Sequence, residues 1–177
     1  GNVHQVDILT GKVIRTISLD GKIGEKTFKD SFASDMALIS EKNELLVLDQ
    51  ANYRMVRIDL GTGGLKSSTA TGRLPFGITL SPDHQFAFVA NVGMYAYPIV
   101  EGTTPENIQS QYNPHHPYGN DTKESREGTV INGKKIPGLG DPRAEEAMSV
   151  FQINLQTNQT EKIYKPGFQL GEMVEEM

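Results

Sequence analysis

The stretch that decides the fold is Ser81-Pro-Asp-His-Gln-Phe-Ala-Phe-Val-Ala-Asn91, a turn followed by an apolar run. Pro82 already has the φ angle that the first corner of a type I turn requires, and Asp83 tolerates unusual backbone angles. The apolar run is short and bounded by turn signals, so it predicts a buried β-strand over residues 86–91.

The same pattern occurs earlier in the chain, which indicates an internal repeat. The stretch 36–50 has a polar turn between two apolar runs, and its Ser40 lies 41 residues before Ser81. A second shared element is the hairpin Val6-Asp-Ile-Leu-Thr-Gly-Lys12, which returns at 58–64 and at 153–159. Its Thr-Gly or Thr-Asn pair supplies the residue that reaches positive φ in a tight turn.

A period near 41 residues with four short strands per unit is typical of a β-propeller blade. We therefore predict an all-β fold, a partial β-propeller of about two and a half four-stranded antiparallel blades. The predicted units are an outer half-blade at 3–19, a first blade at 33–71 and a second blade at 74–166 that is interrupted by an insertion at 95–147.

Propellers usually need four to eight blades to close, so this count predicts an incomplete ring. Sheets that stop short of closure leave open edges and uncovered apolar surface. We expect the remainder of a larger propeller, or another chain, to complete the ring.

The composition excludes several other classes of partner and location. The net charge is −5 with acids and bases interspersed, so no basic field favours nucleic acid. No apolar run approaches the roughly eighteen residues of a membrane span, and no signal-peptide pattern is visible. Cysteine is absent, so no disulfide or cysteine-ligated metal stabilises the fold.

The stretch 74–93 resembles the YVTN-type bacterial β-propeller repeat proteins. The matching residues are Pro75, Gly77, Ser81, Pro82, Asp83, Val89, Ala90 and Asn91. His84 departs from the pattern, since glycine is usual at that place in the turn. The resemblance implies a propeller fold and is nearly silent on function, because propellers carry unrelated activities.

The later segment 132–155 looks like a narrower group of exported bacterial propellers, often fused to a C-terminal alkaline-phosphatase-like phosphoesterase domain. This resemblance implies a periplasmic, cell-surface or secreted location. No phosphoesterase residue can be placed on this chain, so none is carried over.

The two long links should lie on one face of the propeller. Blade strands run antiparallel from the axis outward, so the link from strand two to strand three and the link between blades leave the same face. The 95–147 insertion links strands two and three of the second blade, and the 20–34 segment links the half-blade to the first blade. Long loops in compact domains are usually functional or disordered, so we expect the ligand-binding face here.

The insertion supplies most of the candidate ligand-binding residues, namely Tyr95, Tyr97, Tyr112, His115, His116 and Tyr118. Histidine is the commonest metal ligand, but adjacent histidines in an extended loop point in opposite directions. Loop packing is the alternative interpretation. The polar stretch 120–129 either starts with a short helix or is mobile. An Asn-Gly hairpin is expected at 130–136 and one helical turn at 142–147.

The strand ends facing the insertion supply the other candidates, Asp35, Gln50 and Asn91, together with Asp49. Carboxylate and amide oxygens suit Ca²⁺, although nothing in the sequence requires a cofactor. The alternative, which we favour, is hydrogen bonding to the backbone of the links between blades.

Three functions are compatible with this sequence. The first is a non-catalytic binding or scaffold module that contacts a small molecule, a glycan or an attached phosphoesterase domain. The second is a propeller lactonase or hydrolase with a metal at the channel mouth. The third is a cell-surface structural protein. No phosphate loop, nucleophile elbow or zinc-protease motif occurs.

Overall fold

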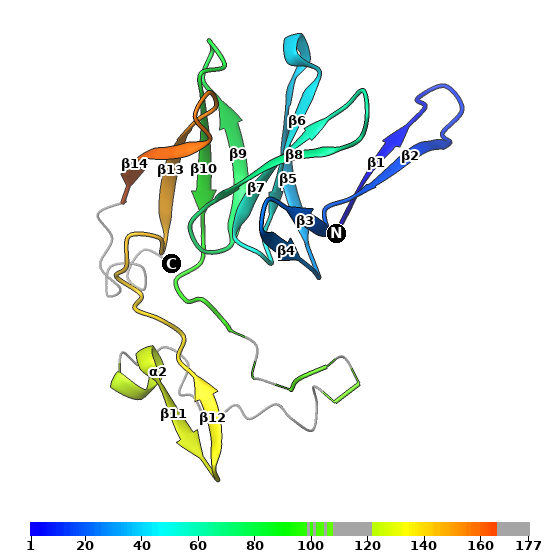
Figure 1. The fold of residues 1–177 in the computed structure, drawn as a ribbon. Helices are drawn as coiled ribbons and strands as arrows, with labels where there is room; N and C mark the ends of the chain where they lie inside the picture. The colour runs from blue at the N-terminus through cyan, green and yellow to red at the C-terminus, as the bar shows by residue number, and fades with distance from the viewer. Residues whose placement is uncertain (99, 101, 105, 108–121, 166–177) are drawn as a thin grey trace.

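The computed structural model describes residues 1–98, 100, 102–104, 106–107 and 122–165. The described chain is all-β apart from one short α-helix and one 3₁₀ turn, η1 (Ser40–Lys42). Its larger sheets are two four-stranded antiparallel meanders that stand side by side (Figure 1). No helix in these residues is long and apolar enough to cross a membrane.

The first blade is the sheet β5-β6-β7-β8, in which each strand pairs with its neighbour in the chain. Its strands are β5 (Ala33–Ile39), β6 (Glu44–Asp49), β7 (Arg54–Asp59) and β8 (Leu65–Ala70). β6 and β7 are buried along almost their whole length because both of their faces are covered.

The second blade has the order β9-β10-β13-β14. Its strands are β9 (Pro75–Leu80), β10 (Phe86–Asn91), β13 (Ser149–Asn154) and β14 (Gln159–Tyr164). The insertion between β10 and β13 contains α2 (Lys123–Glu127) and a hairpin of β11 (Gly128–Ile131) and β12 (Lys134–Pro137). The Asn-Gly hairpin is thus confirmed, and the short helix is the alternative that the structure shows for the polar stretch before it. The predicted helical turn after Asp141 is instead a pair of consecutive tight turns.

Two smaller sheets precede the first blade. β1 (Asn2–Val6) and β2 (Val13–Ser18) form the half-blade, and in the part of the chain that the structure describes they pair with no other strand. β3 (Gly21–Ile23) and β4 (Lys26–Phe28) form a small hairpin within the link to the first blade.

Two apolar cores hold the sheets together face to face. One lies between the two blades and is formed by Ile39, Leu46, Leu48, Met55, Ala87, Val89, Phe151, Ile153 and Leu155. The other lies between the half-blade and the first blade and is formed by Val3, Ile17, Leu19, Leu45, Val47, Val56 and Ile58. The first blade is therefore covered on both faces, as in a propeller, and the ring is open at both ends.

The register corrects the repeat length inferred from the two serines. Met36 pairs with Val47 and Ile78 pairs with Val89, so structurally equivalent residues of the inner strands are 42 positions apart, not 41. Ser40 and Ser81 are not equivalent, because Ser40 starts η1 whereas Ser81 directly follows β9. A slip of one residue would turn every side chain to the wrong face, so only the longer spacing brings both cores together.

Candidate functional site

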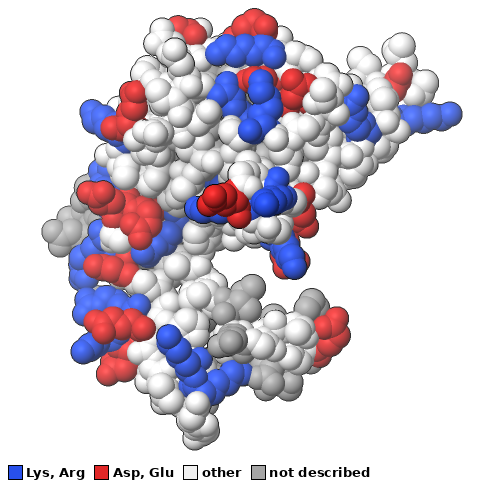
Figure 2. Space-filling model, in the orientation of Figure 1, with Lys and Arg blue, Asp and Glu red and all other residues white. Residues whose placement is uncertain are grey.

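The two long links do leave the same end of the sheets. In Figure 1 the β3–β4 hairpin and the described part of the insertion lie at the lower end, while the tight turns at 40–43, 81–85 and 155–158 lie at the upper end. Figure 2 shows a hollow below the sheets, on the side where the insertion leaves them. Acidic and basic side chains are intermingled over the face shown, with no large area of one sign.

Asp35 and Gln50 lie at the lower end of the first blade. The carboxylate of Asp35 accepts hydrogen bonds from the backbone N–H of Met36 at 2.8 Å and of Ile78, in the neighbouring blade, at 2.9 Å. Gln50 is half-buried, and its own N–H donates to the Phe32 carbonyl at 2.7 Å. Asp35 thus ties the innermost strands of the two blades together.

Asp49 is the last residue of β6, directly before Gln50, and is completely buried. It accepts hydrogen bonds from Phe32 N–H at 2.9 Å, from the Asn52 amide at 2.9 Å and from Arg54 Nε at 2.7 Å. The Arg54 guanidinium also lies 3.6 Å from the centre of the Phe28 ring. Asp49 therefore supports the link over the lower end of the first blade rather than facing solvent.

Asn91 is the structural counterpart of Asp49 in the second blade and is only 3% exposed. Its side-chain amide donates to the carbonyls of Val89 at 3.2 Å and Ser149 at 3.3 Å. The Oδ1 atom has no hydrogen-bond partner among the described residues. A ligand could reach Asn91 only through that buried oxygen.

Tyr95 and Tyr97 form an aromatic pair where the insertion leaves the blade. Their rings meet edge to face, with centroids 6.1 Å apart and an interplanar angle of 81°. Tyr95 is 6% exposed whereas Tyr97 is 46% exposed, so only Tyr97 presents its ring to solvent. Tyr112, His115, His116 and Tyr118 lie outside the described residues.

Tyr53 joins this pair from the first blade. Its hydroxyl donates to the carbonyl of Ala96, which links the β6–β7 turn to the start of the insertion. Burial raises the pKa of the Tyr53 hydroxyl, so it remains a neutral donor at physiological pH.

Arg73, which the sequence did not single out, holds both ends of the insertion. Its guanidinium donates to the carbonyls of Met94 at 2.7 Å and Asp141 at 2.9 Å, and pairs with the Glu146 carboxylate at 2.8 Å. Its backbone also bonds Gly93 and Glu146, each at 2.9 Å. Arg73 is 5% exposed, so this contact is part of the packed interior.

Backbone hydrogen bonds connect the segments within the insertion to one another. Ala96 N–H donates to Leu139 at 2.7 Å, and Leu139 N–H donates to Ser125 at 2.6 Å. Thr122 caps α2 through its hydroxyl, which accepts from Ser125 N–H at 3.2 Å. The buried residues of this lobe include Tyr95, Ile136 and Leu139. The described insertion is therefore a packed lobe with a fixed base.

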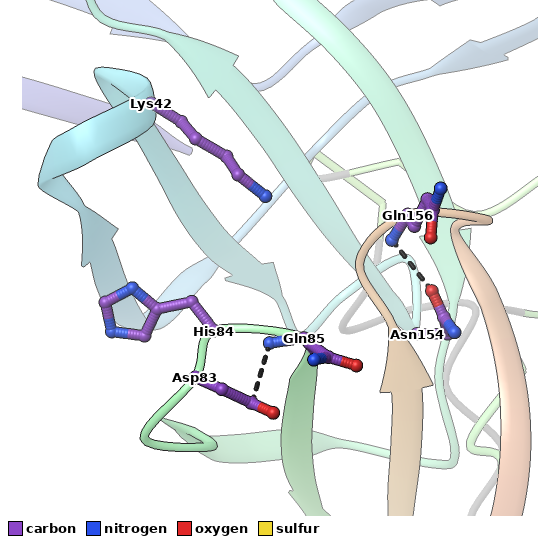
Figure 3. Close-up of a pocket in the computed structure, with 6 residues that line it drawn as sticks. All are labelled: Lys42, Asp83, His84, Gln85, Asn154 and Gln156. Atoms are coloured by element: carbon purple, nitrogen blue, oxygen red, sulfur yellow. Dashed lines mark hydrogen bonds between the residues drawn. The ribbon is translucent and has the colours of Figure 1, made fainter.

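A separate pocket of about 330 Å³ opens at the upper end, between the turns of the two blades (Figure 3). The residues that line it are all polar or charged, namely Lys42, Asp83, His84, Gln85, Asn154 and Gln156. Figure 3 shows Lys42 reaching in from η1, with Asp83 and Gln85 on one neighbouring turn and Asn154 and Gln156 on another. No sequence pattern marked this pocket, because its sides come from three separate turns.

Some side chains around the pocket already form hydrogen bonds or ion pairs within the chain, and others do not. His84 contacts the Glu41 carboxylate across the two blades, and this contact lowers the pKa of Glu41. Hydrogen bonds from Ser81 and from Gln85 N–H lower the pKa of Asp83. Within the described part of the chain, the ammonium group of Lys42 and the side-chain amides of Gln85 and Gln156 form no hydrogen bond, so they are available to a polar, hydroxyl-bearing molecule.

Neither end of the sheets carries an assembled metal centre within the described residues. No group of three or more histidine, aspartate or glutamate side chains in this part of the chain is placed to hold a metal ion. The strand-end carboxylates of the first blade, Asp35 and Asp49, are occupied by backbone and arginine donors.

Comparison with known proteins adds little to this geometry. No protein-family model matches the chain, and no curated protein matches it. One similar solved structure is that of hydrazine synthase from Kuenenia stuttgartiensis, at 15% sequence identity and a TM-score of 0.44. The alignment covers 92% of this chain but 42% of that one, so this chain spans less than half of its length.

Proposed function

We propose that this chain is a non-catalytic binding or scaffold segment of a larger β-propeller, and that the insertion is its ligand-contacting part. The observation that carries the proposal is the anchoring by Arg73, which fixes both ends of the insertion to the link between the blades. A loop that merely connected two strands would need no such buried clamp, because β10 and β13 already pair along their whole length.

The chemistry of the lobe suits a small molecule or a glycan. Tyr97 offers a ring that is 46% exposed at the base of the insertion. Aromatic rings with a polar tip are common in binding sites that combine apolar contact with hydrogen bonding. The resemblance of segment 132–155 to exported bacterial propellers supports a periplasmic or surface location and an attached phosphoesterase domain.

A deletion of the insertion tests this proposal. Because Ala96 N and Leu139 O are 2.7 Å apart, a link of about four glycine and serine residues can replace residues 97–138 without moving the blade. We expect the full chain to bind members of a glycan and small-molecule array, and the deletion variant to lose that binding while keeping its β-sheet circular dichroism. Equal binding by both chains would overturn the proposal.

The upper pocket provides the matched control. Lys42→Ala changes that pocket at the far end of the sheets, so it should leave binding by the insertion unchanged. The alternative function, a propeller lactonase or hydrolase, predicts that the full chain turns over lactone substrates when Ca²⁺ or another divalent cation is added. Such turnover would replace the binding proposal with the enzymatic one.

A further inference from the structure

The three copies of the outer hairpin turn lie in very different surroundings. Leu60 and Leu155 occupy the same position in the turns of the first and second blades, and Ile8 occupies it in the half-blade. Leu155 is 2% exposed and Leu60 is half-buried, but Ile8 is 94% exposed. An apolar side chain so exposed at a repeated core position indicates that its cover is missing.

The backbone at this position shows what the cover is in the complete blades. Leu60 N–H donates to the Asn43 carbonyl and Leu155 N–H donates to the Gln85 carbonyl, each at 2.9 Å. Asn43 and Gln85 both end the turn between the two inner strands of their own blade. The half-blade has no inner strands among the described residues, and Ile8 N–H forms no hydrogen bond there.

The face of the first blade that is turned toward the half-blade also has apolar side chains without a cover. Met36 and Leu38 on β5 are each 54% exposed. Their counterparts in the second blade, Ile78 and Leu80, pack against the core between the blades. The register places Met36 and Leu38 on the side of the half-blade, beside Val47 and Leu45, so the inner strands of that unit would cover them.

The edge of β1 is a third feature, besides Ile8 and the exposed face of β5, that lacks the contacts found in the complete blades. Among the described strands β1 pairs with β2 only, whereas its counterparts β7 and β13 each pair with an inner strand as well. Figure 1 shows β1 and β2 at one side of the molecule, beyond the first blade. A single two-stranded hairpin would pair with the free edge of β1. It would also cover Met36 and Leu38 and accept a hydrogen bond from Ile8 N–H.

We infer that the free edge of β1 is the docking site of a two-stranded antiparallel β-hairpin that completes the half-blade. This inference rests on the proposed role as a propeller segment. The occupant has strands of about six residues, alternating apolar side chains facing Met36 and Leu38, and a tight turn whose last carbonyl accepts Ile8 N–H. The interface between the two complete blades supplies this pattern.

The chain itself supplies a probe in the correct register. Asn2 is the counterpart of Arg54, so a second copy of residues 33–53 placed directly before Asn2, in place of Gly1, reproduces the connection seen in the first blade. In the copy, Met36, Leu38, Leu45 and Val47 are changed to Thr, because that face would be exposed. The control fusion also changes Leu46 and Leu48 of the copy to Lys, which removes the side chains that must contact the first blade.

The readout is amide hydrogen exchange at Ile8, followed by NMR. We expect exchange at Ile8 to slow about ten-fold or more in the fusion and to stay unchanged in the control. Unchanged exchange in the fusion, with the amides of β6 and β7 still protected, would overturn the inference. So would protection of Ile8 in the natural chain that grows with its concentration, since a second copy would then cover the edge.

This outcome is independent of the proposed ligand binding. The insertion leaves the second blade, so failure of the hairpin to dock does not affect the array experiment with the insertion deletion. Conversely, a chain that bound no ligand could still accept the hairpin on β1.

Discussion

Two arginines, Arg57 and Arg15, carry out the same task at successive interfaces between blades. Arg57 Nη1 donates to the Leu155 carbonyl at 2.5 Å and to Asn158 Oδ1 at 2.8 Å, both in the next blade. Arg15 Nη1 donates to the Leu60 carbonyl at 3.0 Å. Each arginine satisfies a backbone carbonyl of the neighbouring turn, so the apolar contact between blades gains a fixed register.

Glu44 is the residue that makes the burial of Arg57 possible. The Glu44 carboxylate, with 6% of its side chain exposed, pairs with Arg57 at 2.7 Å and also contacts Lys66. Burial alone raises the pKa of Glu44, but the hydrogen bonds from Lys66 and Arg57 outweigh it, so the pKa is lowered.

We predict that Glu44→Gln destabilises the chain by about 3 kcal/mol at neutral pH, because it leaves a buried arginine without its counter-ion. Urea unfolding followed by circular dichroism measures this loss. Glu25→Gln, on the exposed β3–β4 turn, is the matched control and should stay within about 0.5 kcal/mol of the natural chain. Equal midpoints for the two variants would show that the Glu44–Arg57 pair adds no net stability.

At the scale of the element, the insertion is a lobe whose base is held by the buried Arg73, with Tyr53 as a second contact. The guanidinium of Arg73 reaches Met94 and Asp141, which lie at opposite ends of the insertion, and a side chain at Gly140 would approach within 2.9 Å of it. The lobe has buried residues of its own. Loss of the Arg73 hydrogen bonds should therefore free the segments around Met94 and Asp141 before the hairpin β11–β12 unfolds.

We predict that Arg73→Met speeds proteolytic cleavage near residues 94–98 and 139–146 by about ten-fold or more, because local opening there no longer breaks buried hydrogen bonds. Limited proteolysis with mass spectrometry locates the cuts. Arg15→Met is the control, since Arg15 binds a turn at the other end of the sheets. Faster cleavage in β6 or β7 instead would mean that Arg73 stabilises the blades rather than the lobe.

At the scale of the whole molecule, ionised aspartates hold the turns at the upper end. Asp7 and Asp59 have lowered pKa values because backbone N–H groups of Thr10 and Thr62, respectively, donate to them. The pKa of Asp83 is lowered by the Ser81 hydroxyl. Each of these groups contributes stability above its unfolded pKa, about 3.8, and that contribution is lost as the pH falls through the folded value.

We therefore predict that stability falls between about pH 5 and pH 2, and that Asp59→Asn makes the fall shallower. Asparagine keeps an oxygen that can accept from Thr62 but does not titrate, so one group is removed from the proton linkage. Urea midpoints measured across this range test the slope. A variant with the same slope as the natural chain would contradict the role assigned to Asp59.

The sequence alone determined the all-β class, the blades and the position of the insertion, because these follow from local turn chemistry and short apolar runs. Thr-Gly turns and alternating strands are encoded within ten or so neighbouring residues, so they can be recognised without the rest of the fold. The resemblance of 74–93 to propeller repeats depends on the same local signals.

Only the tertiary structure decided the register and the roles of single residues. The 42-residue spacing depends on which strand faces pack together, and Asn91 became a buried strand-end residue because Gly72 and Ser149 close over it. Arg73, the polar upper pocket and the uncovered Ile8 each depend on segments far apart in the chain. Contacts of that kind arise from packing, which no local pattern of residues specifies.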